Sequence, residues 1–217
     1  MTSQKYPTIS FGHSPEMEAR RLLHVAGTLS QSWFQKHAFL VLPRPLRKVP
    51  TSQVIFPPLA YETIPDFWNR VSKLKLTTPM EAPADLLTQL TTLVAATYEP
   101  KVYDTHVQDL ERDWNQIKDL FWHNLFTQFP AYREMLSHIQ VYSTAYGPYT
   151  TFGLAEKPHS HVTIYVRQDS GVERLLWTIL MCLFRPKMQY DLHYTWEEIE
   201  AVVDWLMSES TLSARLS

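Results

Sequence analysis

Two histidines and a set of carboxylates are the residues of this 217-residue chain whose types and spacing best fit metal chemistry. His159 and His161 stand two positions apart at the start of a predicted strand, so both imidazoles would point to one face of it. Glu197, Glu200 and Asp204 recur near the steps that place side chains on one face of a helix. Imidazoles and carboxylates are zinc ligands, so a divergent metal-dependent hydrolase that uses this set is one interpretation. In the alternative, the histidines lie exposed at a loop edge and the carboxylates form the solvated face of an amphipathic helix.

Four aromatic side chains form a second candidate site, in and around a predicted hairpin. They are Tyr146, Tyr149, Phe152 and Tyr165. Aromatic residues are enriched where protein interfaces gain most of their binding energy. Stacking on nucleic acid bases would also need basic side chains, and only Lys157 and Arg167 lie close by in the sequence. The group therefore predicts a protein-binding or packing surface rather than one for nucleic acid.

Composition argues against several other activities. Cys182 is the one cysteine, so the chain has neither an internal disulfide nor a zinc site built from several cysteines, and its apolar neighbours predict an inert buried thiol. With five glycines and no phosphate-loop or dinucleotide fingerprint, a glycine-cradled phosphate site is not expected. The formal net charge of −2 lacks the basic footprint of a DNA-binding protein.

The hydropathy pattern gives no sign of a membrane segment. No apolar run approaches the roughly 18 residues of a spanning helix, and the N-terminus lacks an apolar signal core. We expect a soluble cytoplasmic protein, whose oligomeric state stays open.

Prolines divide the first half of the chain into short elements. A helix is expected from Ser14, its N-cap, through Pro15 at the first helical position to about Leu29. Residues 38–42 predict a strand that the following prolines end. We expect residues 1–104 to pack on the core of the remaining chain within one compact unit. The other elements of this half are two connectors and two helices, at 56–65, 77–83, 66–74 and 83–98.

The second half is more regular and indicates the fold class. Thr105 and Gln108 predict a capping box for one long amphipathic helix that ends before Pro130. Alternating and helical apolar patterns predict two strands and two C-terminal helices, the first of them stopped by Pro186. These elements are expected at 138–147, 161–169, 171–184 and 196–207, with capping boxes Ser170/Glu173 and Thr195/Glu198 on the helices. The chain is therefore expected to be α+β and mostly helical, with a small antiparallel sheet or hairpin.

The order of these elements over residues 105–208 resembles the minimal zinc metallopeptidases of the SprT-like and WLM-like kind. In the resemblance, "YSTAYGPYTTFG" and "HVTIYVRQD" form the hairpin, "VERLLWTILMCLF" is the metal-binding helix, and "TWEEIEAVVDWLM" is the supporting helix. The resemblance implies that residues 105–217 form a metallopeptidase-like core.

The His-Glu-x-x-His motif of that family is absent. The best register places Trp177, Thr178 and Met181 where the family has histidine, glutamate and histidine. Tryptophan cannot bind zinc, methionine is a poor zinc ligand, and threonine is no general base at neutral pH. We therefore expect a non-catalytic interaction or accessory protein on a degenerate metallopeptidase-like scaffold, with no cofactor and with a protein partner. The metal-dependent hydrolase, with zinc, and a small regulatory protein of unrelated α+β fold remain alternatives.

Overall fold

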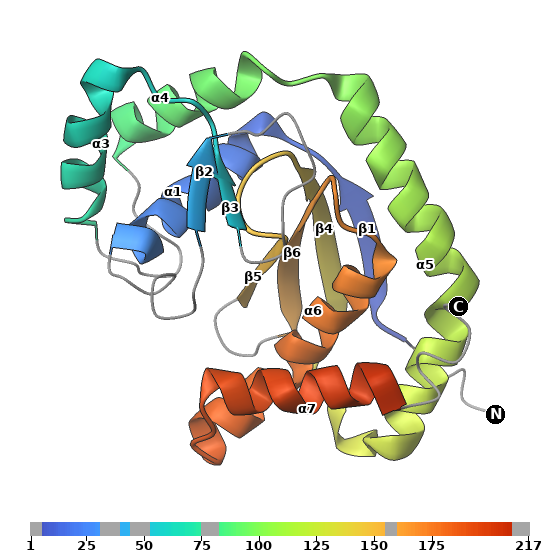
Figure 1. The fold of residues 1–217 in the computed structure, drawn as a ribbon. Helices are drawn as coiled ribbons and strands as arrows, with labels where there is room; N and C mark the ends of the chain where they lie inside the picture. The colour runs from blue at the N-terminus through green and yellow to red at the C-terminus, as the bar shows by residue number, and fades with distance from the viewer. Residues whose placement is uncertain (1–5, 31–39, 44–52, 75–82, 155–159, 210–217) are drawn as a thin grey trace.

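The computed structural model describes residues 6–30, 40–43, 53–74, 83–154 and 160–209 (Figure 1). It has an α+β fold, which confirms the expected class. The helices are α1 (Pro15–Ser30), α3 (Ile64–Val71), α4 (Ala84–Ala95), α5 (Pro100–Gln128), α6 (Val172–Arg185) and α7 (Trp196–Glu209), with short turns η1 (Tyr61–Thr63), η2 (Pro130–Tyr132) and η3 (Pro186–Asp191). The strands are β1 (Thr8–Gly12), β2 (Leu40–Pro43), β3 (Gln53–Phe56), β4 (His138–Thr144), β5 (Thr150–Leu154) and β6 (His161–Arg167).

The main sheet is mixed rather than antiparallel. Its strand order is β1-β4-β6-β5, with β1 parallel to β4, β4 parallel to β6, and β5 antiparallel to β6. The expectation that β4 and β6 pair antiparallel was wrong. The connection between them contains β5, which runs back along β6 as an edge strand, so β6 points in the same direction as β4.

One face of this sheet supplies the larger core. Ile139 and Val141 of β4 and Val162 and Ile164 of β6 are buried, because alternate residues of a strand point to the same face. The side chains of α5, α6 and α7 pack with them in one apolar cluster. Figure 1 shows α6 crossing the sheet and α7 lying across its lower end.

The N-terminal residues belong to the same sheet. β1, which the sequence patterns did not predict, pairs with β4 from Thr8↔His138 to Gly12↔Tyr142. The expected division between residues 104 and 105 falls inside α5. A second apolar cluster joins α1, α3, α4 and β3 to Ala145 and Tyr146, which follow β4.

Helix starts differ in how well the capping signals predicted them. The Ser14 hydroxyl accepts a hydrogen bond from Met17 N–H at 3.3 Å, which confirms that cap. The predicted box at Thr105 is wrong, because α5 already begins at Pro100 and the Thr105 hydroxyl donates to Lys101 O at 2.8 Å. Proline suits that first position because its missing N–H would have no partner there.

The two C-terminal capping boxes also differ. Thr195 and Glu198 form theirs: Thr195 N–H donates to Glu198 Oε2 at 2.7 Å, and Glu198 N–H donates to the Thr195 hydroxyl at 3.3 Å. The box of Ser170 with Glu173 is not formed, since Gly171 is the N-cap of α6 and makes no side-chain bond. Pro186 ends the α-helical geometry of α6, but the chain continues directly into the π-helical turn η3.

Candidate binding surface

The helix that the resemblance would make the metal-binding helix, α6, is a core helix. Thr178 and Met181 are completely buried, and the Thr178 hydroxyl donates to Arg174 O at 2.7 Å within the helix. Trp177 is half-buried, and its indole N–H donates to Asp204 Oδ1 of α7 at 2.8 Å. These three side chains therefore hold α6 in the core and against α7.

Cys182 lies in the same helix and is also buried. Burial raises the pKa of its thiol well above the ordinary value, since a thiolate would lose its hydration there. The thiol is therefore protonated at neutral pH and is not a nucleophile.

The predicted metal ligands are distributed over separate elements. His159 lies outside the described residues. His161 is exposed at the start of β6, with its ring centroid 6.0 Å from that of His138, while Glu197 and Glu200 lie in α7. Among the described residues, no three histidine, cysteine, aspartate or glutamate side chains come together in a group that could hold a metal ion.

The four aromatic residues do not share one surface. Tyr146 is fully buried and its hydroxyl lies 2.6 Å from that of Thr97, so its expected place on a surface is corrected. Phe152 pairs with Ile164 in the strand register and Tyr165 pairs with Thr151, which puts Phe152 and Tyr165 on opposite faces of the sheet.

The partners of the half-buried aromatic side chains differ accordingly. Phe152 stacks on Trp196, the first residue of α7, at 6.3 Å between centroids. Tyr165 stacks on Tyr142 at 5.7 Å. Tyr149 lies under the guanidinium of Arg167 at 4.3 Å. Each ring thus packs locally, and the group is not a single interface.

A buried polar cluster that the sequence patterns did not predict lies under the turn after β4. We call Glu18, Arg21 and Arg167 the turn cluster, and all three are at most 4% exposed. Glu18 Oε1 accepts from the backbone N–H groups of Ala145 and Tyr146, both at 2.8 Å. Its Oε2 accepts from the Tyr103 hydroxyl at 2.8 Å. Burial raises the pKa of the Glu18 carboxyl, against the lowering effect of these hydrogen bonds.

Arg21 binds the turn with the whole of its guanidinium. It donates to Tyr146 O at 2.9 Å, to Pro148 O at 2.7 Å and to the Thr151 hydroxyl at 2.7 Å, and it also donates to the Thr144 hydroxyl. Burial lowers the pKa of Arg21 to about 10, so the side chain keeps its charge at neutral pH.

Arg167 fixes the same turn from the sheet. Its guanidinium donates to Gly147 O at 2.8 Å and to Gln53 O at 2.9 Å, and it forms a bidentate pair with Asp169 at 2.7 and 3.0 Å. Gly147 has a φ of 91° and its backbone also pairs with Ile55 of β3. Every side-chain nitrogen and carboxylate oxygen of the three residues of the turn cluster makes a hydrogen bond within the protein, so the cluster is a structural support.

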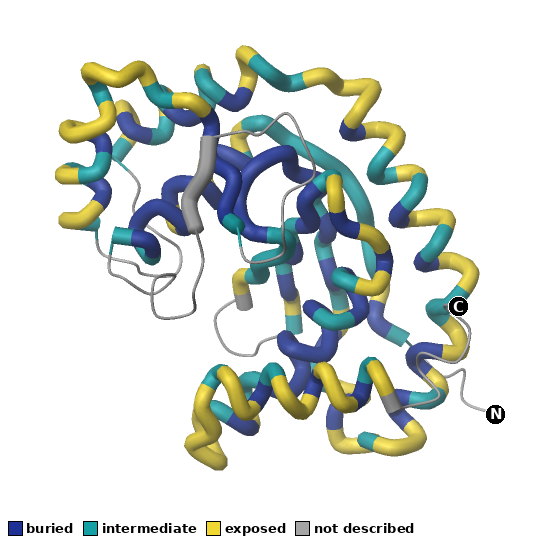
Figure 2. Tube along the Cα trace, in the orientation of Figure 1, coloured by how far each residue is buried: buried dark blue, intermediate teal, exposed yellow. Residues whose placement is uncertain are grey.

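Apolar side chains gather on the outside at the C-terminal end. Of the nine large apolar side chains that are exposed in the described part of the chain, five lie within residues 190–205. We call these five the Trp205 surface: Tyr190, Leu192, Tyr194, Val202 and Trp205. Trp205 is 60% exposed, and Figure 2 shows the turn before α7 and much of α7 as exposed.

The helical period explains which side chains of α7 reach the outside. Ile199, Val203 and Leu206 lie within about 60° of one another around the helix and are buried. Val202 lies at the edge of that stripe and is 36% exposed, although its spacing of three residues from Ile199 is typical of a core position. Trp205 lies still farther round and faces outward.

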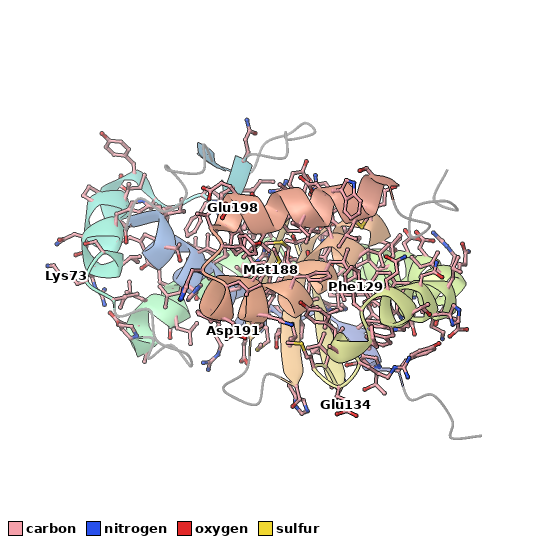
Figure 3. The ribbon with its side chains drawn as sticks, turned by 90° about the horizontal axis from the view of Figure 1, so that it is seen from below. Lys73, Phe129, Glu134, Met188, Asp191 and Glu198 are labelled. Atoms are coloured by element: carbon pink, nitrogen blue, oxygen red, sulfur yellow. The ribbon has the colours of Figure 1, made fainter. Side chains whose placement is uncertain are left out.

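The turn before α7 has a fixed backbone. His193 has a φ of 59°, in the left-handed region that non-glycine residues seldom adopt. On either side of it, Leu192 N–H donates to Lys187 O at 3.1 Å and Tyr194 N–H donates to Met188 O at 2.9 Å. These bonds anchor the exposed Leu192 and Tyr194 to η3. The view from below labels Met188 and Asp191 in η3 and Glu198 in α7 (Figure 3).

The position of the Trp205 surface has a weak signal in the sequence. The segment 186–208 contains more apolar residues than one buried stripe of α7 can use, and the surplus is aromatic or aliphatic.

None of the helices in the described residues combines the length and apolar character needed to cross a membrane. Comparison of the chain with family models, with curated proteins and with solved structures finds no match.

Proposed function

We propose that this protein is a non-catalytic binding module that holds another protein through the Trp205 surface. The observation that carries the proposal is the concentration of five exposed large apolar side chains in residues 190–205. Apolar side chains that face water add little to the stability of the fold. They add most to the free energy of binding when a partner covers them. Tryptophan and tyrosine are also the residues most enriched at the centres of protein interfaces.

The surroundings of the surface support a binding role because they are rigid. α7 is capped by Thr195 and Glu198, and Trp177 ties α7 to α6 through Asp204. The turn that carries Leu192 and Tyr194 is anchored to η3. A surface that is ordered before binding loses less conformational entropy when a partner arrives.

The non-catalytic part of the proposal rests on α6 and on Cys182. The residues in the metallopeptidase motif positions are packing residues, and the thiol is buried and protonated. The order of a long helix, strands and two C-terminal helices is the one on which the resemblance was based, although the antiparallel pair consists of β5 and β6 rather than β4 and β6. We therefore propose that the scaffold is a degenerate minimal metallopeptidase-like core used for binding.

Selection from a library of displayed random peptides tests the binding role. The full chain is used as bait, together with Trp205→Ala and, as a matched control, Tyr61→Ala. Tyr61 is 85% exposed but lies in η1, away from the Trp205 surface in the chain. We expect enriched peptides that the wild type and Tyr61→Ala retain and Trp205→Ala loses. Enriched peptides that bind Trp205→Ala as well as the wild type, or a lack of enrichment, would overturn the proposal.

A further inference from the structure

The charge around the Trp205 surface restricts what can cover it. Residues 186–208 contain five acidic residues, Asp191, Glu197, Glu198, Glu200 and Asp204, and one lysine, Lys187, which gives a formal charge of −5 + 1 = −4. The whole chain has a net charge of −2, so the other residues together carry +2. The apolar side chains thus lie in an acidic segment of the chain.

Two of these carboxylates are held in place beside the apolar side chains. Glu198 lies four positions before Val202, which puts the two on one side of α7. Its carboxylate is oriented by the N–H of Thr195. Asp204, next to Trp205, is oriented by the indole N–H of Trp177. Fixed charges next to an apolar surface favour a partner with the opposite charge at matching positions.

The acidic charge argues against three other occupants. Nucleic acids and anionic lipid surfaces carry negative charge and would be repelled. A second copy of the chain, in a two-fold dimer, would bring the same carboxylates to face one another. A basic protein segment gains from the same field, and an arginine in it can also lie over the exposed indole ring.

Resting on the proposed function, we infer that the Trp205 surface binds a basic amphipathic segment of a partner protein. The apolar side chains of that segment cover Val202 and Trp205, and its lysine or arginine side chains face Glu198 and Asp204. Because the charges are exposed, the attraction is screened by salt.

Two synthetic helical peptides test this inference against the full chain by fluorescence anisotropy. Both carry leucine and tryptophan on one face, and the other face has lysine and arginine in one peptide and glutamate in its match. We expect the basic peptide to bind at least about tenfold more tightly, and its affinity to fall roughly tenfold when salt rises from about 50 to about 500 mM.

Conservative variants test whether the carboxylates of Glu198 and Asp204 attract the basic peptide. Glu198→Gln keeps the capping box, because glutamine can also accept there, and Asp204→Asn keeps an acceptor for Trp177. We expect each to weaken the basic peptide roughly threefold to tenfold. Glu62→Gln removes an exposed carboxylate beside Tyr61 and should leave the affinity unchanged.

The outcomes separate this inference from the proposed function. Peptide binding that depends on Trp205 but is indifferent to peptide charge, salt and the two carboxylates would overturn the inference and leave the binding role standing. Binding of anionic vesicles, or concentration-dependent dimers in sedimentation that Trp205→Ala abolishes, would overturn it as well. Binding of the basic peptide that does not depend on Trp205 would overturn both.

Discussion

The turn cluster and the Trp205 surface reverse the usual placement of polar and apolar groups. In the turn cluster, three charged side chains lie inside the protein, and each of them makes at least one hydrogen bond to the backbone of one turn. In the Trp205 surface, five large apolar side chains lie outside. The buried charges are costly to leave unpaired, so they specify one conformation of the turn. The exposed rings contribute little to the folded state, so their identity is open to selection for binding.

The largest effect should follow from removing a member of the turn cluster. Arg21→Ala leaves two backbone carbonyls and two hydroxyls without their donor in the interior. We expect the free energy of unfolding to fall by about 3–5 kcal/mol in urea denaturation. Arg20→Ala, which removes the neighbouring exposed arginine, should change it by less than about 0.5 kcal/mol. Similar small losses for both variants would contradict the structural role of the cluster.

The next largest loss of stability should follow from changing the backbone of the same turn at Gly147. At Gly147, φ is +91° and an added Cβ would lie 2.8 Å from Arg21 Cζ. Gly147→Ala should therefore lower the free energy of unfolding by about 2–3 kcal/mol. Gly153→Ala is the matched control, because a Cβ there meets no atom within 4 Å. Equal melting temperatures for the two variants would show that the turn adapts without strain.

Acid should destabilise the fold through His106, which is half-buried. Its Nε2–H donates to Ser170 O at 2.9 Å, and its Nδ1 lies 2.8 Å from the Ser143 hydroxyl. Burial lowers the pKa of His106, only partly offset by its bond to Ser170 and by Asp109 and Asp169. The unfolded chain therefore binds this proton first, and stability is lost as pH falls from about 6.5 through the lower folded-state pKa.

The size of that loss is limited by one proton. Relative to His106→Gln, the wild type should lose at most about 1.4 kcal/mol per pH unit over this window, measured by urea denaturation at several pH values. A constant difference between the wild type and His106→Gln over this window would rule out a His106 imidazole that is neutral in the folded protein.

The smallest effect on stability belongs to the outer surface. Trp205→Ala should change the free energy of unfolding by less than about 0.5 kcal/mol, while abolishing peptide binding. Trp177→Ala provides the contrast, because that half-buried ring packs on the core and bonds to Asp204, and we expect a loss of about 2 kcal/mol. Calorimetry on the two variants checks this, and a large loss for Trp205→Ala would place the ring in the folding core.

The sequence predicted those features that depend on local patterns. The α+β class, the burial of Cys182 and the cap at Thr195 follow from apolar periodicity and from neighbouring residues. β1 and β3 were not predicted, because each has few residues and its partner is distant or lies beyond a proline-rich stretch. The parallel pairing of β4 with β6 depends on where β5 lies, which periodicity does not encode.

The candidate sites were harder to predict for the same reason. Phe152 pairs with Ile164, so it lies on the opposite face of the sheet from Tyr165. A shift of one residue in strand register would reverse the face of each side chain, and the sequence pattern does not specify that register. The roles of Glu18 and Arg21 depend on a turn more than 120 residues later. The exposure of Val202 depends on how α7 is rotated about its axis. The apolar positions Ile199, Val202, Val203 and Leu206 do not determine that rotation, because either edge of their stripe can face the core.

The pairing of β1 with β4 has a consequence for synthesis of the chain. Thr8 pairs with His138, so about 130 residues must be made before the first strand can find its neighbour. At about 5–20 residues per second, that interval is roughly 7 to 26 s. During it, "TISFG" is an unpaired strand with Ile9 and Phe11. The slow step in folding is therefore expected to be this long-range closure, and the nascent chain is most open to aggregation or chaperone capture at its first strand.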